Sequence, residues 1–282
     1  MIQEIRSFAR YEEFIRKIAA DPDRKDPHFT YNEDNLYRAM ENPNAKAYIV
    51  TENDVITGLF VWLVLPEEAY IELLVGLSGS GDAFREMLAF LEREYPHCQM
   101  DFVISPRNTA LRQVLEEKKA AFDPEQVKMR WEGAAAVQPH HNITLLSPAF
   151  EEQYRTLHDT ETYWTADKVL AAGDRFRVFI VAEGQRLLGY LDVTYAYEEN
   201  EPYALWVDEA YAGQGYEEAL LAAAAAANAP NRMIAFIDAG DAAMNKIYRA
   251  AGFVPVAGQN HIYASYRHLT RTHTLFDGAN QR

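Results

Sequence analysis

Two glycines separated by one residue, Gly213 and Gly215, stand directly before an alanine-rich helical stretch at residues 217–228. Where such a loop opens into a helix, the unpaired N–H groups of the first turn and the positive end of the helix dipole attract an anion, and the missing side chains let a phosphate approach. No Gly-Lys-Ser/Thr sequence follows, and the spacing differs from a dinucleotide-binding fingerprint. The loop therefore indicates an anion site unlike those for ATP or NAD, although ordinary turn chemistry also places glycines before helices.

The elements that position this loop occur twice along the chain. Residues 48–60 and 179–191 each read as a strand, a polar hairpin turn and a second strand. A short β-favouring run follows in both halves, at 71–75 and at 203–207, and leads through a pair of glycines into a helical stretch.

Both halves then continue in the same order. A buried strand is predicted at 100–105 in the first half and at 233–237 in the second. Each strand leads into an amphipathic helix, for which Asn108 and Asp241 are the expected N-caps. Because the order of elements is repeated, we interpret the chain as a tandem duplication with little sequence identity left.

The boundary between the copies is predicted from composition. Residues 133–139 form a low-charge segment that contains Gly and Pro, as linkers do. We place the boundary near residue 137, which gives an N-terminal domain at 1–136 and a C-terminal domain at 137–282. Strands that alternate with helices predict an α/β (α+β) fold, with a mixed sheet covered by helices in each domain.

Two stretches of the second half resemble a known family. Residues 207–217 read VDEAYAGQGYE, and residues 247–253 read IYRAAGF. They are similar to the Val-Asp/His-Pro-Glu-Tyr strand end with its Arg-Gly-Gln-Gly-Ile-Gly loop, and to the Leu-Tyr-Glu-Lys-Leu-Gly-Phe helix end, of the GNAT superfamily of acyl-CoA-dependent N-acyltransferases. The resemblance covers roughly residues 143–268, with a fainter echo over 2–131. It implies two tandem GNAT-like domains, each with a mixed, mostly antiparallel sheet flanked by helices, of which the N-terminal copy is degenerate.

The resemblance also assigns roles to residues of the C-terminal copy. It implies that acetyl-CoA is the co-substrate, that the main chain of Leu205 and Val207 binds the pantetheine arm, and that Tyr248 protonates the departing thiolate. The loop that would bind the pyrophosphate consists of Gly213, Gln214, Gly215, Tyr216 and Glu217.

The chemistry assigned to Tyr248 is physically reasonable. A phenol with a pKa of about 10 that faces a thiolate of pKa about 8.5 transfers its proton uphill by about 1.5 units, or ~2 kcal/mol, which a hydrogen bond to the developing charge can largely offset. A tyrosine on a helix face that only packs in the core is the alternative interpretation.

Two positions depart from the family pattern. Ala212 stands where the family has a loop arginine, and Glu217 stands where it has a glycine or alanine. A carboxylate about 5 Å from one phosphate charge costs ~1 kcal/mol in water and ~3 kcal/mol at an effective dielectric constant of ~20. Glu217 would then weaken binding by one to two decades. Alternatively, Glu217 points to solvent and favours the helix through the dipole.

The N-terminal copy shows the reverse pattern. Its loop at residues 78–83 keeps a small residue at the last position, but the place of the tyrosine falls on Leu115, which cannot donate a proton. We interpret this half as a structural or acceptor-shaping copy; in the rival interpretation it holds the cofactor.

A general base must take a proton from the attacking ammonium, directly or through water. The candidates are Glu201, just before the strand that ends at Val207, and Asp192, on the strand after Gly189. Either residue is also consistent with a solvated surface acid.

The composition of the chain limits which partners the protein is expected to bind. The formal net charge of −15 disfavours nucleic acid, whose binding relies on Lys and Arg displacing counterions. The single cysteine, Cys98, excludes an internal disulfide and paired-thiolate zinc sites, so we expect no metal. The longest apolar runs, at 59–65 and 219–227, are far shorter than a membrane span. We therefore expect a cytoplasmic, soluble protein with no membrane partner.

Two functions follow from these observations. The first is an N-acetyltransferase that moves an acetyl group from acetyl-CoA to a primary amine of a small molecule, by direct attack in a ternary complex. The acceptor is then a polyamine, an aminoglycoside-like amine or an amino acid. The alternative is a non-catalytic scaffold that binds acyl-CoA or protein partners. An aminoacyl-transferase that uses charged tRNA is disfavoured by the net charge.

Overall fold

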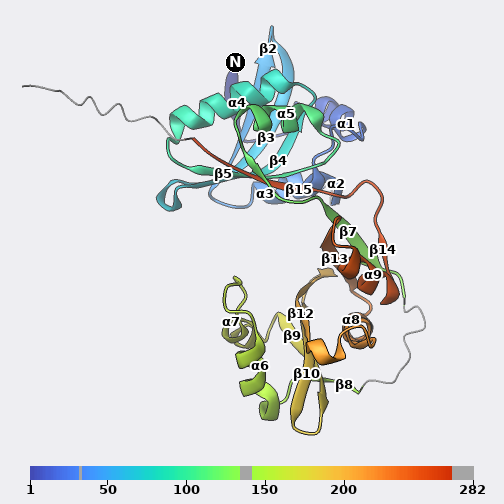
Figure 1. The fold of residues 1–282 in the computed structure, drawn as a ribbon. Coiled ribbons are helices and arrows are strands. Elements are labelled where there is room, and N and C mark those ends of the chain that lie inside the picture. Colours follow the sequence, from blue (N-terminus) through green and yellow to red (C-terminus); the bar gives the residue numbers. More distant parts are fainter. Residues whose placement is uncertain (32–33, 134–141, 269–282) are drawn as a thin grey trace, which may run out of the picture. The chain divides into compact units, whose positions relative to one another are not determined.

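The computed structural model describes residues 1–31, 34–133 and 142–268 (Figure 1). Mixed and antiparallel sheets are flanked by helices in this part of the chain. The predicted α/β (α+β) fold class is therefore confirmed. Apart from Gly133, the predicted linker at 133–139 lies outside the described residues.

The chain folds into two compact units. Unit 1 consists of Met1–Glu125 together with the described residues from Gly258 onward, and unit 2 consists of Gln126–Ala257. The polypeptide therefore passes from one unit to the other twice.

Unit 1 is built on a mixed sheet that is antiparallel except where β4 and β5 run parallel. Its strands, in order across the sheet, are β1 (Ile2–Ile5), β2 (Ala45–Glu52), β3 (Val55–Leu65), β4 (Tyr70–Ser78), β5 (Gln99–Ile104), β15 (Ile262–Arg267) and β6 (Ala121–Phe122). Its helices are α1 (Glu12–Ala19), α2 (Pro27–Tyr31), α3 (Asn35–Ala39), η1 (Pro66–Glu68), α4 (Gly81–Glu94) and α5 (Thr109–Glu117).

Helices cover both faces of this sheet, and the strands are apolar on both faces in consequence (Figure 1). Along β2, Tyr48 packs in the cluster formed with α4 and α5, whereas Ile49 packs in the cluster formed with α1 and α3. Successive side chains of a strand point to opposite faces, so a continuous apolar run serves two cores.

Unit 2 contains two short sheets. One runs β12 (Pro202–Val207), β10 (Arg186–Thr194), β9 (Phe176–Glu183) and β8 (Ile143–Leu145), and the other runs β11 (Glu199–Asn200), β13 (Arg232–Asp238), β7 (Gln126–Trp131) and β14 (Phe253–Pro255). The helices are η2 (Pro148–Phe150), α6 (Glu151–Leu157), α7 (Ala166–Ala171), η3 (Glu209–Tyr211), α8 (Tyr216–Asn228) and α9 (Ala242–Ala250). The long helix α8 packs on one face of the β9–β10 hairpin, and α6 and α7 pack on the other.

Each unit is completed by a strand from the opposite half of the sequence. β7 lies between β13 and β14, where Met129 is opposite both Ala235 and Pro255. β15 lies between β5 and β6, where Ala264 is opposite Phe102 and Phe122. The two copies thus exchange their last strands.

This exchange was not foreseen from the sequence. A single division at residue 137 assigns β7 to the N-terminal copy and β15 to the C-terminal copy, but by pairing each lies in the other unit. The composition of a linker shows where the chain is loosely packed, whereas backbone pairing decides which sheet a strand joins.

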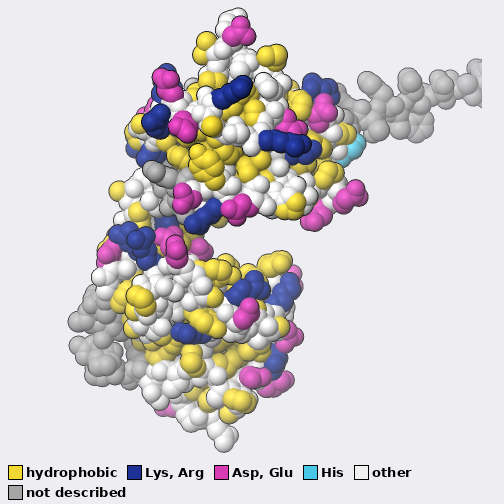
Figure 2. Space-filling model, turned by 180° about the vertical axis from the view of Figure 1, so that it is seen from behind, with side chains coloured by type: hydrophobic (Ala, Val, Ile, Leu, Met, Phe, Trp, Pro, Cys, Tyr) yellow, Lys and Arg dark blue, Asp and Glu magenta, His cyan; other side chains and the backbone are white. Residues whose placement is uncertain are grey.

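Charged side chains are mixed on the molecular surface. On the face drawn in Figure 2, Lys and Arg side chains are scattered among Asp and Glu within each unit rather than gathered in one patch. No helix in the described part of the chain has the length and apolar character needed to cross a membrane.

The exchange predicts that a substitution near the C-terminus disturbs the sheet of unit 1. Ala264 is 4% exposed and packs in the core with α4 and α5. We expect Ala264→Asp to destabilise unit 1 by about 3 kcal/mol or more, since it buries an unpaired charge. Peptide-level hydrogen exchange should then speed up in β5 and β6, and Arg267→Gln, at an exposed position of the same strand, is the control. Faster hydrogen exchange confined to unit 2 would contradict the assignment of β15 to the sheet of unit 1.

Candidate functional site

A cavity of about 530 Å³ lies in unit 2 against β12 and β13, which belong to separate sheets. Its walls come from these two strands, from the connection between α6 and α7, and from α9. The predicted residues Leu205 and Tyr248 both line it. The cavity therefore brings together two residues that are 43 positions apart in the sequence.

One edge of β12 has no strand partner in the described part of the chain, because β12 pairs only with β10. The N–H of Asp208 points toward β10 and donates to the carbonyl of Leu188 at 2.8 Å. Main-chain groups alternate in direction along a strand, so those of Leu205 and Val207 point to the open edge. This edge can pair with an extended, amide-containing ligand.

Tyr248 lies on α9 with its ring in the core and is 4% exposed. The ring packs edge-on against Phe253 at a centroid distance of 5.1 Å. Burial raises the pKa of Tyr248 above its ordinary value. The phenol is thus protonated at neutral pH, which is the form that donates a proton or a hydrogen bond.

The glycine loop has the geometry that its sequence predicts. Gly213 and Gly215 have φ values of 71° and 88°, in the left-handed region that side chains disfavour. Gly215 is the N-cap of α8, and no side chain caps this helix. A Cβ placed on Gly213 would meet nothing within 4 Å, so the loop is open on that side. The first turn of α8 therefore presents main-chain N–H groups without a capping side chain.

Glu217 does not point to solvent. Its side chain is only 9% exposed, and its Oε2 atom has no hydrogen-bond partner among the described residues. It shares the buried side of α8 with Leu221 and Ala224. The solvent-facing interpretation is therefore wrong, and the unpaired oxygen is a source of strain at the start of the helix.

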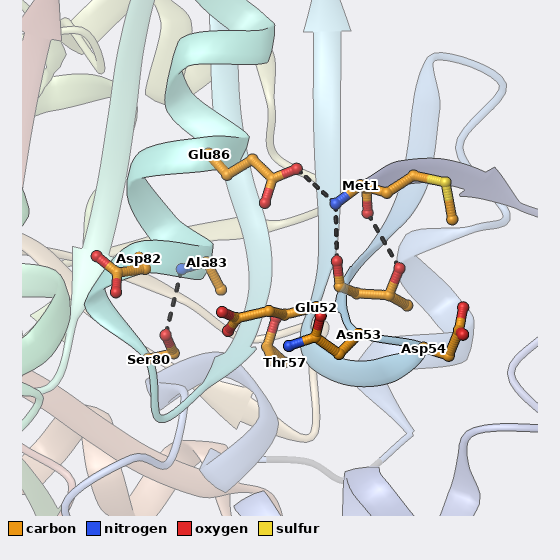
Figure 3. A pocket seen from close by; sticks show the side chains of 10 residues that line it. Met1, Glu52, Asn53, Asp54, Thr57, Ser80, Asp82, Ala83 and Glu86 are labelled. Atoms are coloured by element: carbon orange, nitrogen blue, oxygen red, sulfur yellow. Dashed lines mark hydrogen bonds and ion pairs between the residues drawn. The ribbon is translucent and has the colours of Figure 1, made fainter.

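The corresponding loop of unit 1 is closed by the protein itself. Ser80 caps α4 by accepting a hydrogen bond from the N–H of Ala83 at 3.3 Å (Figure 3). A Cβ on Gly79 would collide with the guanidinium of Arg24, so this side chain covers the glycine. The N–H of Gly76, on β4, donates to the buried carboxylate of Asp26 at 2.7 Å. In unit 1, side chains thus cover or hydrogen-bond to main-chain groups whose counterparts in unit 2 have no such side-chain contact.

The cavity next to this unit 1 loop is acidic. Figure 3 shows Glu52, Asp54, Asp82 and Glu86 around it, and no Lys or Arg side chain is among the described residues that line it. Glu86 is paired with the N-terminal ammonium of Met1 and Asp82 with Arg85, which leaves the carboxylates of Glu52 and Asp54 to repel a diphosphate. Leu115, at the place of the tyrosine, is fully buried in the core and carries no proton donor.

Asp192 lies in a buried network rather than at the cavity. It is 0% exposed, accepts a hydrogen bond from the Tyr154 hydroxyl at 2.9 Å, and lies 2.8 Å from Nε2 of His158. The hydrogen bond to Asp192 raises the pKa of His158 against the opposing effect of burial. Burial raises the pKa of Asp192, and its two hydrogen-bond partners oppose that shift.

A stack of rings connects this network to the cavity. The imidazole of His158 is stacked on Tyr190 at 5.5 Å, and Tyr190 is stacked on Trp206 at 5.7 Å. Tyr190 and Trp206 both line the cavity. The pairing of His158 with a carboxylate 34 positions away has no local signal in the sequence.

Glu201, the other candidate base, does not line the cavity, although the next residue, Pro202, does. Burial raises the pKa of Glu201, and Lys128 opposes this shift. Lys128 is itself buried and forms an ion pair with Glu199 at 3.0 Å. Glu201 thus belongs to a cluster of charges beside the cavity.

The carboxylates that line the cavity are Asp159, Asp238 and Asp241. Sequence reasoning found only Asp241, and only as a helix cap, a prediction that is confirmed by its bond from the N–H of Met244 at 2.9 Å. The position of Asp238 at the end of a buried strand is the signal that was missed. Within the described residues no group of three or more His, Cys, Asp or Glu side chains could hold a metal ion.

Residues 174–255 match the family model for the acetyltransferase (GNAT) domain. The matched segment includes β12, the glycine loop and α9, and therefore the cavity residues Leu205 and Tyr248. The resemblance to the GNAT superfamily inferred from the sequence is thereby confirmed. The match supports acyl transfer, and an acetyltransferase, as the general class of activity.

Solved structures show the same fold at low sequence identity. A GCN5-related N-acetyltransferase from Sphaerobacter thermophilus has a TM-score of 0.64 at 11% identity, covering 94% of this chain and 95% of that one. An acetyltransferase of the GNAT family from Colwellia psychrerythraea has a TM-score of 0.52 at 13% identity, with coverages of 95% and 100%. A tandem GNAT protein from the clavulanic acid biosynthesis pathway has a TM-score of 0.50 at 10% identity, with coverages of 95% and 98%. No curated protein matches the sequence significantly.

The buried pair predicts a pH dependence of stability. A histidine whose folded pKa is raised contributes stability that is fully present below its unfolded pKa of about 6.5 and is lost as pH rises through the folded value. We therefore expect the advantage of wild type over Asp192→Asn to shrink as pH rises above about 6.5. Denaturation midpoints of both proteins over a pH series measure this, with exposed Asp174→Asn as the control. Parallel curves would show that His158 carries no charge in the fold.

Proposed function

We propose that the protein is an N-acetyltransferase whose site lies in unit 2, where an acetyl group passes from acetyl-CoA to a primary amine of a small molecule in a ternary complex. The observation that carries the proposal is the convergence of three features on one unit. These are the open edge of β12, the uncapped glycine loop, and the cavity that holds Tyr248.

The binding roles follow from the main chain. The outward N–H and C=O groups of Leu205 and Val207 suit the amides of a pantetheine arm, because an extended chain can pair with a strand edge. The left-handed glycines and the first turn of α8 suit a diphosphate. The residues of this loop are Gly213, Gln214, Gly215, Tyr216 and Glu217.

The chemical steps need an acid and a base. The neutral amine attacks the thioester carbonyl, the carbon–sulfur bond breaks, and Tyr248 gives its proton to the departing thiolate. Burial raises the pKa of Tyr248, which keeps the phenol protonated before the reaction and makes its proton transfer to the thiolate more uphill than for an unperturbed phenol. Glu201 would accept the ammonium proton only through water, since it does not line the cavity.

A second function is favoured by one observation. Glu217 places a buried carboxylate with an unpaired oxygen at the start of α8, and Ala212 supplies no cation to offset it. A scaffold with weak or no acyl-CoA binding fits this arrangement. The copies also differ in a way that fits a proposed division of labour: unit 1 supports the structure, and unit 2 binds the co-substrate.

Binding of coenzyme A separates the two functions. At 100 times its dissociation constant the ligand should stabilise the protein by about 2.7 kcal/mol. We expect Glu217→Ala to tighten binding by one to two decades, since the substitution removes a like charge from the phosphates. Thermal shift and calorimetry measure both effects, with exposed Glu209→Ala as the control. No shift at millimolar coenzyme A in either protein would favour the scaffold.

Tyr248→Phe tests the proposed acid. The ring and its packing against Phe253 are preserved, so affinity for acetyl-CoA should stay the same. Turnover of a responsive amine should fall by about 10²-fold or more, in the range that general acid catalysis contributes. Steady-state release of coenzyme A gives kcat. Equal kcat values for the variant and the wild type would remove Tyr248 from the mechanism.

A further inference from the structure

The unit 2 cavity has an unbalanced set of charges. Three carboxylates, those of Asp159, Asp238 and Asp241, are among the described residues that line it, and none of the described lining residues is Lys, Arg or His. A low-dielectric wall concentrates the field of such charges in the space that it encloses. The cavity therefore favours a positively charged ligand over a negatively charged one.

Main-chain hydrogen bonds orient these carboxylates. Oδ1 of Asp238 accepts from the N–H of Gly240 at 2.7 Å, and Oδ1 of Asp241 accepts from the N–H of Met244 at 2.9 Å. Asp159 is held in the same way by the N–H of Glu161 at 2.8 Å. None of the three forms an ion pair with a basic side chain in the described part of the chain. Their negative charge is thus fixed in place and not neutralised there.

Aromatic faces form another part of the cavity wall. Trp206 is half-buried and stacked on Tyr190, and the buried His158 is also stacked on Tyr190. Tyr203 is 51% exposed and lines the same cavity. A ring face attracts an ammonium group, with Trp the strongest of the side chains. Rings held by stacking favour the same sign of ligand charge as the carboxylates do.

Asp241 and the proposed acid, Tyr248, are separated along one helix. Asp241 caps α9, and Tyr248 lies seven residues further on. At 1.5 Å per residue this corresponds to about 10 Å along the helix axis. An acceptor whose reacting amine is close to Tyr248 therefore has room for a second charged group several bonds away.

We infer that the acceptor carries a second positive charge in addition to its reacting amine, and that Asp159, Asp238 and Asp241 select it. This inference rests on the proposed function. Of the acceptor classes left open by the sequence, it favours diamines, polyamines and similar polycations. It disfavours free amino acids, whose carboxylate the same residues repel.

Three acceptors of equal length test the inference. In 1,5-diaminopentane, 5-amino-1-pentanol and 5-aminopentanoate the distal group is positive, neutral and negative. With saturating acetyl-CoA, we expect kcat/KM to be at least about tenfold higher for the diamine than for the alcohol, and lowest for the carboxylate. A tenfold ratio corresponds to about 1.4 kcal/mol of discrimination. The difference should lie mainly in KM, since the distal group takes no part in the chemistry.

The double variant Asp238→Asn with Asp241→Asn removes two charges and retains the fold. Asn caps a helix as well as Asp does, and its Oδ1 can still accept the two main-chain hydrogen bonds. We expect the three kcat/KM values to approach one another in this variant. Asp174→Asn, an exposed carboxylate outside the cavity lining, should leave the wild-type order unchanged.

The outcomes distinguish this inference from the proposed function. Equal kcat/KM values for the three acceptors in the wild type would overturn the inference, while the acetyl transfer itself would uphold the proposed function. Failure of every amine to release coenzyme A would reject the proposed function. In that case, calorimetry without acetyl-CoA measures binding of the three amines to the cavity. Diamine binding that is lost in the double variant supports the inference. Equal binding of the three amines, whatever the charge of the distal group, overturns it.

Discussion

An unpaired strand edge is the constraint on which the site depends. β12 gains its backbone pairing from β10 alone, so alternate main-chain groups on its other edge face the cavity. An edge of this kind attracts any extended chain, including neighbouring strands of the same protein. β13, the other strand that lines the cavity, is paired with β11 on one side and with β7 on the other. A strand from the first half of the sequence therefore belongs to the sheet that forms one wall of the site.

The two units treat the same local motif in opposite ways. In unit 1 a serine caps the helix after the glycines, Arg24 covers Gly79, and Asp26 accepts the hydrogen bond of a β4 amide. Each of these contacts lowers the energy of the empty protein and removes a group that a ligand would use. In unit 2 the loop has neither a capping side chain nor a covering one. The main-chain groups at the glycine loop that lack a side-chain partner thus distinguish unit 2 from unit 1 more clearly than sequence motifs do.

Local features were predictable from the sequence, and long-range ones were not. The hairpins, the strands before each glycine pair and the caps Asn108 and Asp241 follow from periodicity and turn chemistry over a few residues. The partners of β7 and β15 could not be predicted, since an apolar strand fits several edges and only the whole sheet decides.

The candidate site divides in the same way. The segments of the loop and of Tyr248 were found by motif, and the structure brings Leu205 and Tyr248 to one cavity. The pairing of His158 with Asp192 and the burial of Glu217 depend on contacts between distant elements. The place of Asp238 and Asp241 in the cavity was missed for a different reason. Asp238 ends a strand and Asp241 caps a helix, where acids are common whether or not they face a ligand.

The strand exchange has a consequence for biosynthesis. A ribosome finishes β6 at Phe122, but β15, which fills the gap beside it, begins only at Ile262. At roughly 5–20 residues per second, the earlier-made sheet waits on the order of 10 s with β5 and β6 unjoined. All the strands of unit 2 have been synthesised before that. The sheet of unit 1, although synthesised before unit 2, is therefore completed after it. During this interval its unpaired strand edges are exposed and can bind a chaperone.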